Sequence, residues 1–200
     1  RFGLPGFIDL CEQIAEIWRA RRGDIEAQNR DLLASLAGHS ARATGSAELT
    51  AVPIAAAGNL LLGSFDRDFG GFGGAPKFPH PTDLALLLRP KGVQSWRGDD
   101  PLAREAALIT LTRMAEGGIY DQLGGGFCRY STDERWEIPH FEKMLYDNGP
   151  LLGLYADAWA LTGDELFRRT AEQTVGWLQR EMTSPEGAFY SSLDADSEGE

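Results

Sequence analysis

The chain has 200 residues, of which 42% are hydrophobic and 10% aromatic, and its formal net charge is −11. This length and apolar content are enough for one or two domains with a buried core. The acidic balance argues against a nucleic-acid groove, because phosphate binding needs clustered Lys and Arg. No apolar run approaches the roughly 18 residues of a membrane span, so the sequence predicts a soluble protein that binds neither nucleic acid nor membrane.

Two cysteines, Cys11 and Cys128, stand far apart and belong to no CxxC or metal-like grouping. We therefore expect no disulfide framework, no metal site and no cofactor, and a reducing compartment such as the cytoplasm. The acidic run from Asp194 to Glu200 contains the first half of a calcium-loop pattern, but extended-looking residues precede it in place of a helix. The chain starts at Arg1 and stops inside this run, so we expect a piece of a longer protein.

The N-terminal part predicts two helices and a linker. Apolar residues at helical spacing alternate with charged residues over 5–21, which indicates an amphipathic helix that Gly23 ends. A second helix is expected from Ile25 to Leu36. The Ala, Gly, Ser and Thr stretch over 38–47 is typical of a linker, so we place a domain boundary after residue 46.

Helical patterns continue beyond this boundary. We expect helices at about 50–65, 82–89 and 101–116, and another from the N-cap Asp164 to about Met182. A helix that starts near Phe141 should be kinked or divided at Gly149-Pro150, because proline lacks a backbone donor. The glycine-rich segment 117–140 suits an ordered functional loop with a short hairpin. No larger sheet is predicted.

Three glycine-aromatic clusters recur along the chain, at Gly70–Gly74, Gly124–Phe127 and Gly187–Tyr190. Aligned on their phenylalanines, Phe72, Phe127 and Phe189, they are separated by steps of 55 and 62 residues. Each step fits two antiparallel helices with their connections, and a fixed period is the mark of a stacked or circular array. The pattern predicts an all-α fold of repeated helical hairpins.

The segment from Arg129 to Asn148 is the richest in ionisable and aromatic side chains. Projected on a helix, His140, Lys143 and Asp147 would share one face. An imidazole beside a carboxylate can exchange protons near neutral pH, and the indole of Trp136 could form an apolar platform for a sugar ring. The alternative is structural: these side chains would cap and join helices.

The motifs GGFGGAPKFPHP (70–81), GGIYDQLGGGFCRYSTDERWEIPHFEKMLYDN (117–148) and FYSSLDADSEGE (189–200) resemble the spermatogenesis-associated, thioredoxin-domain-containing protein family. The resemblance implies a thioredoxin-like domain followed by an (α/α)6 toroid similar to N-acylglucosamine 2-epimerase and the six-hairpin glycosidases. Residues 1–46 would then be the terminal helices of the thioredoxin-like domain and a linker. Residues 47–200 would be the N-terminal half of the toroid, with about three hairpins.

Sugar sites of related toroids lie at the centre of the ring, and the resemblance implies a site here. The implied catalytic residues are His140, Glu142, Asp147, Asp194 and Asp196. The implied substrate-binding residues are Asp121, Arg129, Tyr130, Trp136 and Lys143.

Two classes of function follow from this site. The first is a carbohydrate-active enzyme, an epimerase or glycoside hydrolase that performs acid-base chemistry on a saccharide. The second is a non-catalytic module that binds a ligand or partner and is attached to a redox domain. In either class the half-ring alone is expected to be inactive, because its cavity stays open to water.

Overall fold

The computed structural model describes residues 5–41, 50–88 and 101–196. The chain divides into two compact units, Arg1–Leu49 and Thr50–Glu200, and each is described by itself.

The first unit consists of helices α1 (Phe7–Ala20) and α2 (Arg22–Ala41). The expected break comes at Arg21 and not at Gly23, which lies inside the first turn of α2. A glycine in a helix costs only about 1 kcal/mol, and Asp24 favours a helix start beside it. Helix α2 also extends past the expected start of the linker, and the rest of that linker lies outside the described residues.

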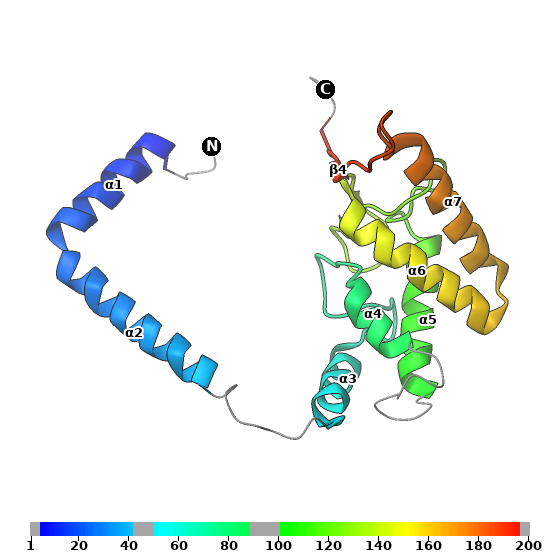
Figure 1. Cartoon of the computed structure of the whole chain (residues 1–200), viewed down its shortest axis with the longest axis horizontal. Helices are drawn as coiled ribbons and strands as arrows, with labels where there is room; N and C mark the ends of the chain where they lie inside the picture. The colour runs from blue at the N-terminus through cyan, green and yellow to red at the C-terminus, as the bar shows by residue number, and fades with distance from the viewer. Residues whose placement is uncertain (1–4, 42–49, 89–100, 197–200) are drawn as a thin grey trace. The chain divides into compact units, whose positions relative to one another are not determined.

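The second unit contains five helices among its described residues: α3 (Val52–Ser64), α4 (Pro81–Leu88), α5 (Pro101–Glu116), α6 (Leu145–Thr162) and α7 (Glu165–Glu181). Helix α4 packs against α6, while α5 packs against both α3 and α7, so the chain alternates between two layers (Figure 1). This alternation is that of helical hairpins side by side. The mostly helical fold expected from the sequence is confirmed.

Local sequence explains where these helices begin and end. The Asp164 carboxylate accepts a hydrogen bond of 2.9 Å from the Leu166 N–H and caps α7. Gly163 ends α6 in the left-handed conformation. The expected division of α6 at Pro150 is wrong, because the helix starts at Leu145 and not near Phe141. Pro150 therefore falls in the second turn, and the helix continues beyond the one backbone hydrogen bond that proline removes.

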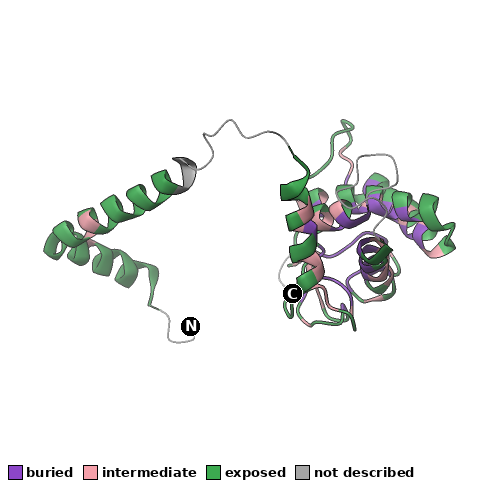
Figure 2. Cartoon of the chain, turned by 90° about the horizontal axis from the view of Figure 1, so that it is seen from below, coloured by how far each residue is buried: buried purple, intermediate pink, exposed green. Residues whose placement is uncertain are grey.

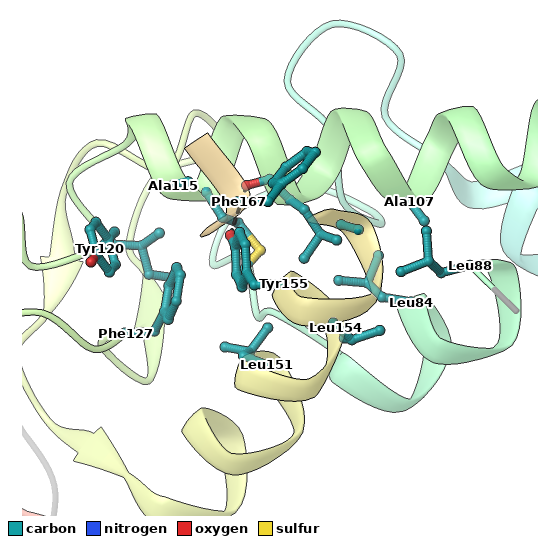
Figure 3. Close-up of a cluster of buried hydrophobic side chains, with 14 of the residues drawn as sticks. Leu84, Leu88, Ala107, Ala115, Tyr120, Phe127, Leu151, Leu154, Tyr155 and Phe167 are labelled. Atoms are coloured by element: carbon teal, nitrogen blue, oxygen red, sulfur yellow. Dashed lines mark hydrogen bonds between the residues drawn. The ribbon is translucent and has the colours of Figure 1, made fainter. Parts of the chain in front are cut away.

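The core lies between the two layers, and its buried side chains come mainly from α4, α5 and α6 (Figures 2 and 3). The ring of Phe127 stacks on that of Tyr155 with 5.2 Å between centroids. The Tyr155 hydroxyl donates to the Leu111 carbonyl at 2.7 Å, so this buried polar group is satisfied. The glycine-rich segment before α6 is thereby attached to the helical core.

Within the ranges that the structure describes, four two-residue strands lie in the loops. Strands β1 (Tyr130–Ser131) and β2 (Pro139–His140) pair antiparallel, and so do β3 (Lys143–Met144) and β4 (Ser192–Leu193). The β1–β2 pair is the short hairpin expected between residues 117 and 140. The expected helical face of His140, Lys143 and Asp147 is wrong, because pairing with β1 and β4 holds the first two residues in extended strands.

Each glycine cluster closes a turn that follows a helix of the same layer. The N–H of Asp66 donates to Gly71 O after α3, at 2.9 Å, and the N–H of Asp121 donates to Gly126 O after α5, at 3.0 Å. The third turn, after α7, has the Ser184 N–H on Ala188 O at 2.7 Å. The period read from the sequence is therefore a repeat of the structure.

Among the helices within the described ranges, none combines the length and apolarity needed to cross a membrane.

Candidate functional site

The first glycine turn holds a buried ammonium group. The Lys77 side chain has no exposed surface, and its Nζ donates to Asp66 Oδ2 at 2.6 Å and to Gly70 O at 2.8 Å. The same ammonium lies 5.5 Å from the centroid of the Trp136 ring. Burial acts to raise the pKa of Asp66, but hydrogen bonds from Lys77 and from the Phe69 and Asp68 amides lower it below its ordinary value.

The second turn repeats this arrangement. Lys143 Nζ donates to Asp121 Oδ2 at 2.7 Å and to Gly125 O at 2.9 Å, and it lies 5.2 Å from the Trp177 ring centroid. The Asp121 carboxylate also accepts from the Leu123 and Gly124 amides. We call the Asp66–Lys77 and Asp121–Lys143 arrangements the two aspartate-lysine locks.

The locks involve two residues of the expected substrate-binding set, Asp121 and Lys143, which also line a cavity of about 370 Å³. Asp121 and Lys143 satisfy each other and the turn, as Asp66 and Lys77 do one repeat earlier, so their geometry is that of a structural pair. Trp136 is wrong as a sugar platform, because its ring is 0% exposed. Its Nε1–H donates to Phe69 O at 2.9 Å, and the ring covers the first lock.

A short cap holds Trp136 in this place. The Asp133 carboxylate accepts hydrogen bonds from the Arg135, Glu137 and Ile138 amides and from the Ser131 hydroxyl. Burial acts to raise the pKa of Asp133, but these bonds, led by that from Ile138, keep it below its ordinary value. The carboxylate therefore shapes the loop between β1 and β2 that sends the indole inward.

A cavity of about 270 Å³ opens where the loops of the two repeats converge. One wall comes from the segment that leads into α4, and the other from the first two turns of α6. The lining residues are Phe78, Pro79, His80, Pro81, Thr82, Tyr146, Asp147 and Pro150. Of the expected site residues, Asp147 lies in this lining.

An aromatic column borders the cavity. The Tyr130 ring is stacked between Phe78, at 4.9 Å and 28° between planes, and His140, at 4.8 Å and 15°. Phe78 lines the cavity and is 37% exposed. Tyr130 and His140 are register partners in the β1–β2 hairpin, so strand pairing brings these two rings together.

Arg129 connects the charged residues. Its Nη1 donates to Glu142 Oε2 at 2.9 Å, and its backbone N–H donates to the Glu142 carbonyl at 2.7 Å. Hydrogen bonds to the Glu142 carboxylate and to Tyr146 raise the pKa of the guanidinium. A cation and a carboxylate therefore stand together beside the tyrosine of the cavity wall.

The surroundings of the cavity change the pKa of Asp147. Its side chain is 9% exposed, and burial raises the pKa of its carboxyl to about 6, against the lowering effect of Arg129 and His80. Glu142 adds to the increase as a like charge. A carboxyl group that titrates near neutral pH is suited to general acid-base work.

The remaining expected residues lie elsewhere or interact differently. The Nδ1 atom of His140 is buried without a hydrogen-bond partner within the described part of the chain. Asp194 and Asp196 are exposed, and the Asp196 N–H donates to Asp194 Oδ1 at 3.4 Å. Neither is among the cavity's lining residues. Within the described ranges, no group of three or more His, Cys, Asp or Glu side chains is suited to a metal ion.

Three residues of the site were missed from the sequence: Phe78, His80 and Tyr146. The signal for the first two was present in Lys77-Phe78-Pro79-His80-Pro81, where prolines flank an imidazole just after a glycine turn. Cys128 is buried, and burial raises the pKa of its thiol, which disfavours a nucleophilic role.

Comparison with solved structures identifies the class of fold. The chain is similar to a sugar epimerase from a ruminal bacterium, with a TM-score of 0.59 and 13% identity over 74% of this chain and 41% of that one. It is also similar to cellobiose 2-epimerase from Spirochaeta thermophila DSM 6192, with a TM-score of 0.56 and 20% identity over 73% and 39% of the two chains. The helices are thus arranged as in part of an epimerase-type (α/α)6 toroid.

Sequence comparison identifies the family. No family model matches the sequence, but the chain is 37% identical over 197 residues to human spermatogenesis-associated protein 20. The match covers 96% of this chain and 25% of the human protein. The chain is homologous to one region of the spermatogenesis-associated protein 20 family and spans about a quarter of the length of the curated relatives it matches.

Proposed function

We propose that the chain is part of a carbohydrate-active toroid, epimerase-like or glycosidase-like, that performs acid-base chemistry on a saccharide. The observation that carries this proposal is the cavity at the starts of α4 and α6, where an aromatic wall meets a carboxyl group with a pKa of about 6. The epimerase-like fold supports the same class of substrate.

The two parts of the site suit the two kinds of surface on a sugar. The apolar face of a sugar ring packs against aromatic rings, which Phe78 and Tyr146 supply. Hydroxyl groups need charged or polar partners, which Arg129 and Glu142 supply beside the cavity. Asp147 then exchanges the proton, with His140 at the end of the column as a second ionisable group.

The third turn extends this proposal beyond the cavity. Strand β4 pairs with β3 in the register Lys143 to Leu193, so Asp194 follows directly after a residue paired with the second lock. Asp194 and Asp196 would complete the acidic wall as the ring continues. We also propose that α1 and α2 close a thioredoxin-like domain, which would cover their exposed apolar residues, such as Phe7 and Trp18. The unpaired cysteines support a cytoplasmic location.

Calorimetry on the whole protein with a panel of mono- and disaccharides tests the proposal. We expect one class of sugar to bind, and Asp147→Asn and His140→Asn to weaken binding or turnover by about 100-fold or more. Asp157→Asn is the matched control, because Asp157 is an exposed aspartate on the same helix and should change neither.

Two results would count against the enzyme class. If no sugar binds across the panel, or if the site variants lose binding only because they unfold, the residues are structural. The alternative of a non-catalytic module attached to a redox domain would then be favoured.

A further inference from the structure

His80 occupies a position that its own chemistry does not favour. It precedes α4, and its carbonyl accepts from the Asp83 and Leu84 amides at 3.0 and 3.2 Å, so it takes the place of the helix N-cap. Its φ is +46°, in the left-handed region, which most side chains rarely adopt and in which histidine is more frequent than most. Asn, Asp, Ser or Gly would suit this position better. A locally unfavourable residue at the edge of a cavity points to a role in the site.

The imidazole of His80, which is 48% exposed, lies near two aromatic rings and one carboxylate. Its ring centroid lies 6.3 Å from those of Phe72 and Phe78, and the prolines on either side restrict the backbone. The Nδ1 atom lies 3.7 Å from Asp83 Oδ2, one turn into α4. Asp83 therefore stands beside one ring nitrogen of the imidazole.

His80 and Asp147 reach the same cavity from different repeats. His80 follows the first lock, Asp147 follows the second, and both belong to the lining of the 270 Å³ cavity. The charge of His80 acts on the Asp147 carboxyl and lowers its pKa.

We propose that His80 and Asp147 are the two proton-exchanging groups of this cavity, with Asp83 as the positioning residue. The pair holds either a carboxylic acid and a neutral imidazole or a carboxylate and an imidazolium. One member gives a proton to the bound sugar and the other takes one from it, so the pair keeps the same number of protons and needs no oxidant or reductant. This inference rests on the proposed function in one respect only, that the molecule exchanging protons with the pair is a sugar.

Other charges face the pair and are part of its titration. Arg129 and Glu142 act on Asp147 from the β1 side and from the segment between β2 and β3, and Tyr146 lies beside it at the start of α6. Asp83 faces His80 from α4. These groups are the same in the His80→Asn and Asp147→Asn variants. A shift in the titration midpoint of the remaining member of the pair therefore reports on the coupling between His80 and Asp147.

Nuclear magnetic resonance titration of the chain from pH 4 to 9 tests the pair without any sugar. His80→Asn suits the left-handed backbone and should raise the midpoint of Asp147, because a cation is lost. Asp147→Asn should lower the midpoint of His80 by the same amount, about 0.5 pH unit or more, because coupling between two sites is reciprocal. Asp83→Asn should also lower the His80 midpoint, and Asp83→Glu should restore it.

The control is Asp157→Asn, which should leave the His80 midpoint unchanged. If His80→Asn fails to fold, the Asp147→Asn titration of His80 still decides the result. Unmoved midpoints would overturn the pair. Coupled midpoints without sugar binding would leave the pair standing and contradict the proposed function, whereas sugar binding without coupling would do the reverse.

Discussion

The first two glycine turns each contain an aspartate-lysine lock. They differ in the length of chain between the aspartate and the lysine. In the first turn Asp66 and Lys77 are 11 residues apart, and in the second Asp121 and Lys143 are 22 apart. The additional length of the second contains the β1–β2 hairpin, which carries Tyr130 and His140 of the aromatic column and directly follows Arg129. The locks that the repeats share therefore hold the scaffold, and the hairpin found only in the second brings Arg129, Tyr130 and His140 beside the cavity.

The cavity lies next to the two locks in the chain. Directly after each lysine the chain enters the helix layer formed by α4 and α6, and His80 and Asp147 stand at these two entries. Each ammonium group is covered by an indole from a later segment, Trp136 in the first lock and Trp177 of α7 in the second. Substitutions in the locks and substitutions in the cavity, made separately, test whether the two have different roles.

The largest loss of stability should follow from breaking the first lock. Asp66→Ala leaves the fully buried Lys77 ammonium without its carboxylate, which should cost about 3 to 5 kcal/mol in the free energy of unfolding. Asp121→Ala should cost less, because the side chains of Lys143 and Asp121 are more exposed than their counterparts. Urea denaturation measures both. A cost below about 1 kcal/mol for Asp66→Ala would show that the lock is not structural.

The sign of the pH dependence follows from the same carboxylate. The folded pKa of Asp66 is lowered, so its contribution to stability is present above its unfolded pKa, near 3.9. The contribution is lost as the pH falls through the lower folded value. Asp66→Ala should therefore flatten the stability profile of the chain below about pH 4.

Next in size is the contact between glycine and indole. A Cβ on Gly71, whose φ is +78°, would lie 2.6 Å from Trp136 Cζ2. Gly71→Ala should therefore cost about 2 to 4 kcal/mol from overlap and backbone strain together. Gly73→Ala is the matched control, because Gly73 has a φ of +71° with nothing within 4 Å of a new Cβ, and it should cost about 1 kcal/mol. Equal losses of stability for Gly71→Ala and Gly73→Ala in thermal or urea unfolding would show that the contact with the indole does not contribute.

Substitution of Asp147 in the cavity should have a smaller effect on the free energy of unfolding, and of the opposite sign. The folded pKa of Asp147, about 6, lies above its unfolded value near 3.9. The ionised carboxylate therefore reduces stability above pH 6, and this cost disappears as the pH falls through 6 toward 4. Asp147→Asn should stabilise the chain by about 1 to 2 kcal/mol at pH 8 and by little at pH 4. A stability difference that does not change with pH would contradict the raised pKa.

The sequence predicted the features that local pattern decides. Apolar spacing and cap residues such as Asp164 gave most helices within a few residues, and the glycine-phenylalanine period gave the repeat. The cluster of Arg129, Tyr130, His140 and Asp147 around one site was also visible, because strand pairing and a short chain separation keep these residues together.

The parts that failed depend on contacts distant in sequence. His140 and Lys143 were placed on a helix because nothing local shows that β1 and β4 pair with them. Trp136 was expected to be accessible, because the contacts with Phe69, Gly71 and Lys77 that bury it come from a segment distant in sequence. His80 was missed because its partner in the cavity, Asp147, comes from the next repeat.

Urea unfolding of Asp121→Asn and Asp147→Asn at pH 8 tests the separation of scaffold and chemistry most directly, because both aspartates were candidates for the same site. The free energy of unfolding should fall by about 2 to 3 kcal/mol for Asp121→Asn, which breaks a lock. It should rise for Asp147→Asn, which removes a buried charge from the cavity. A change of the same sign in both variants would contradict the account.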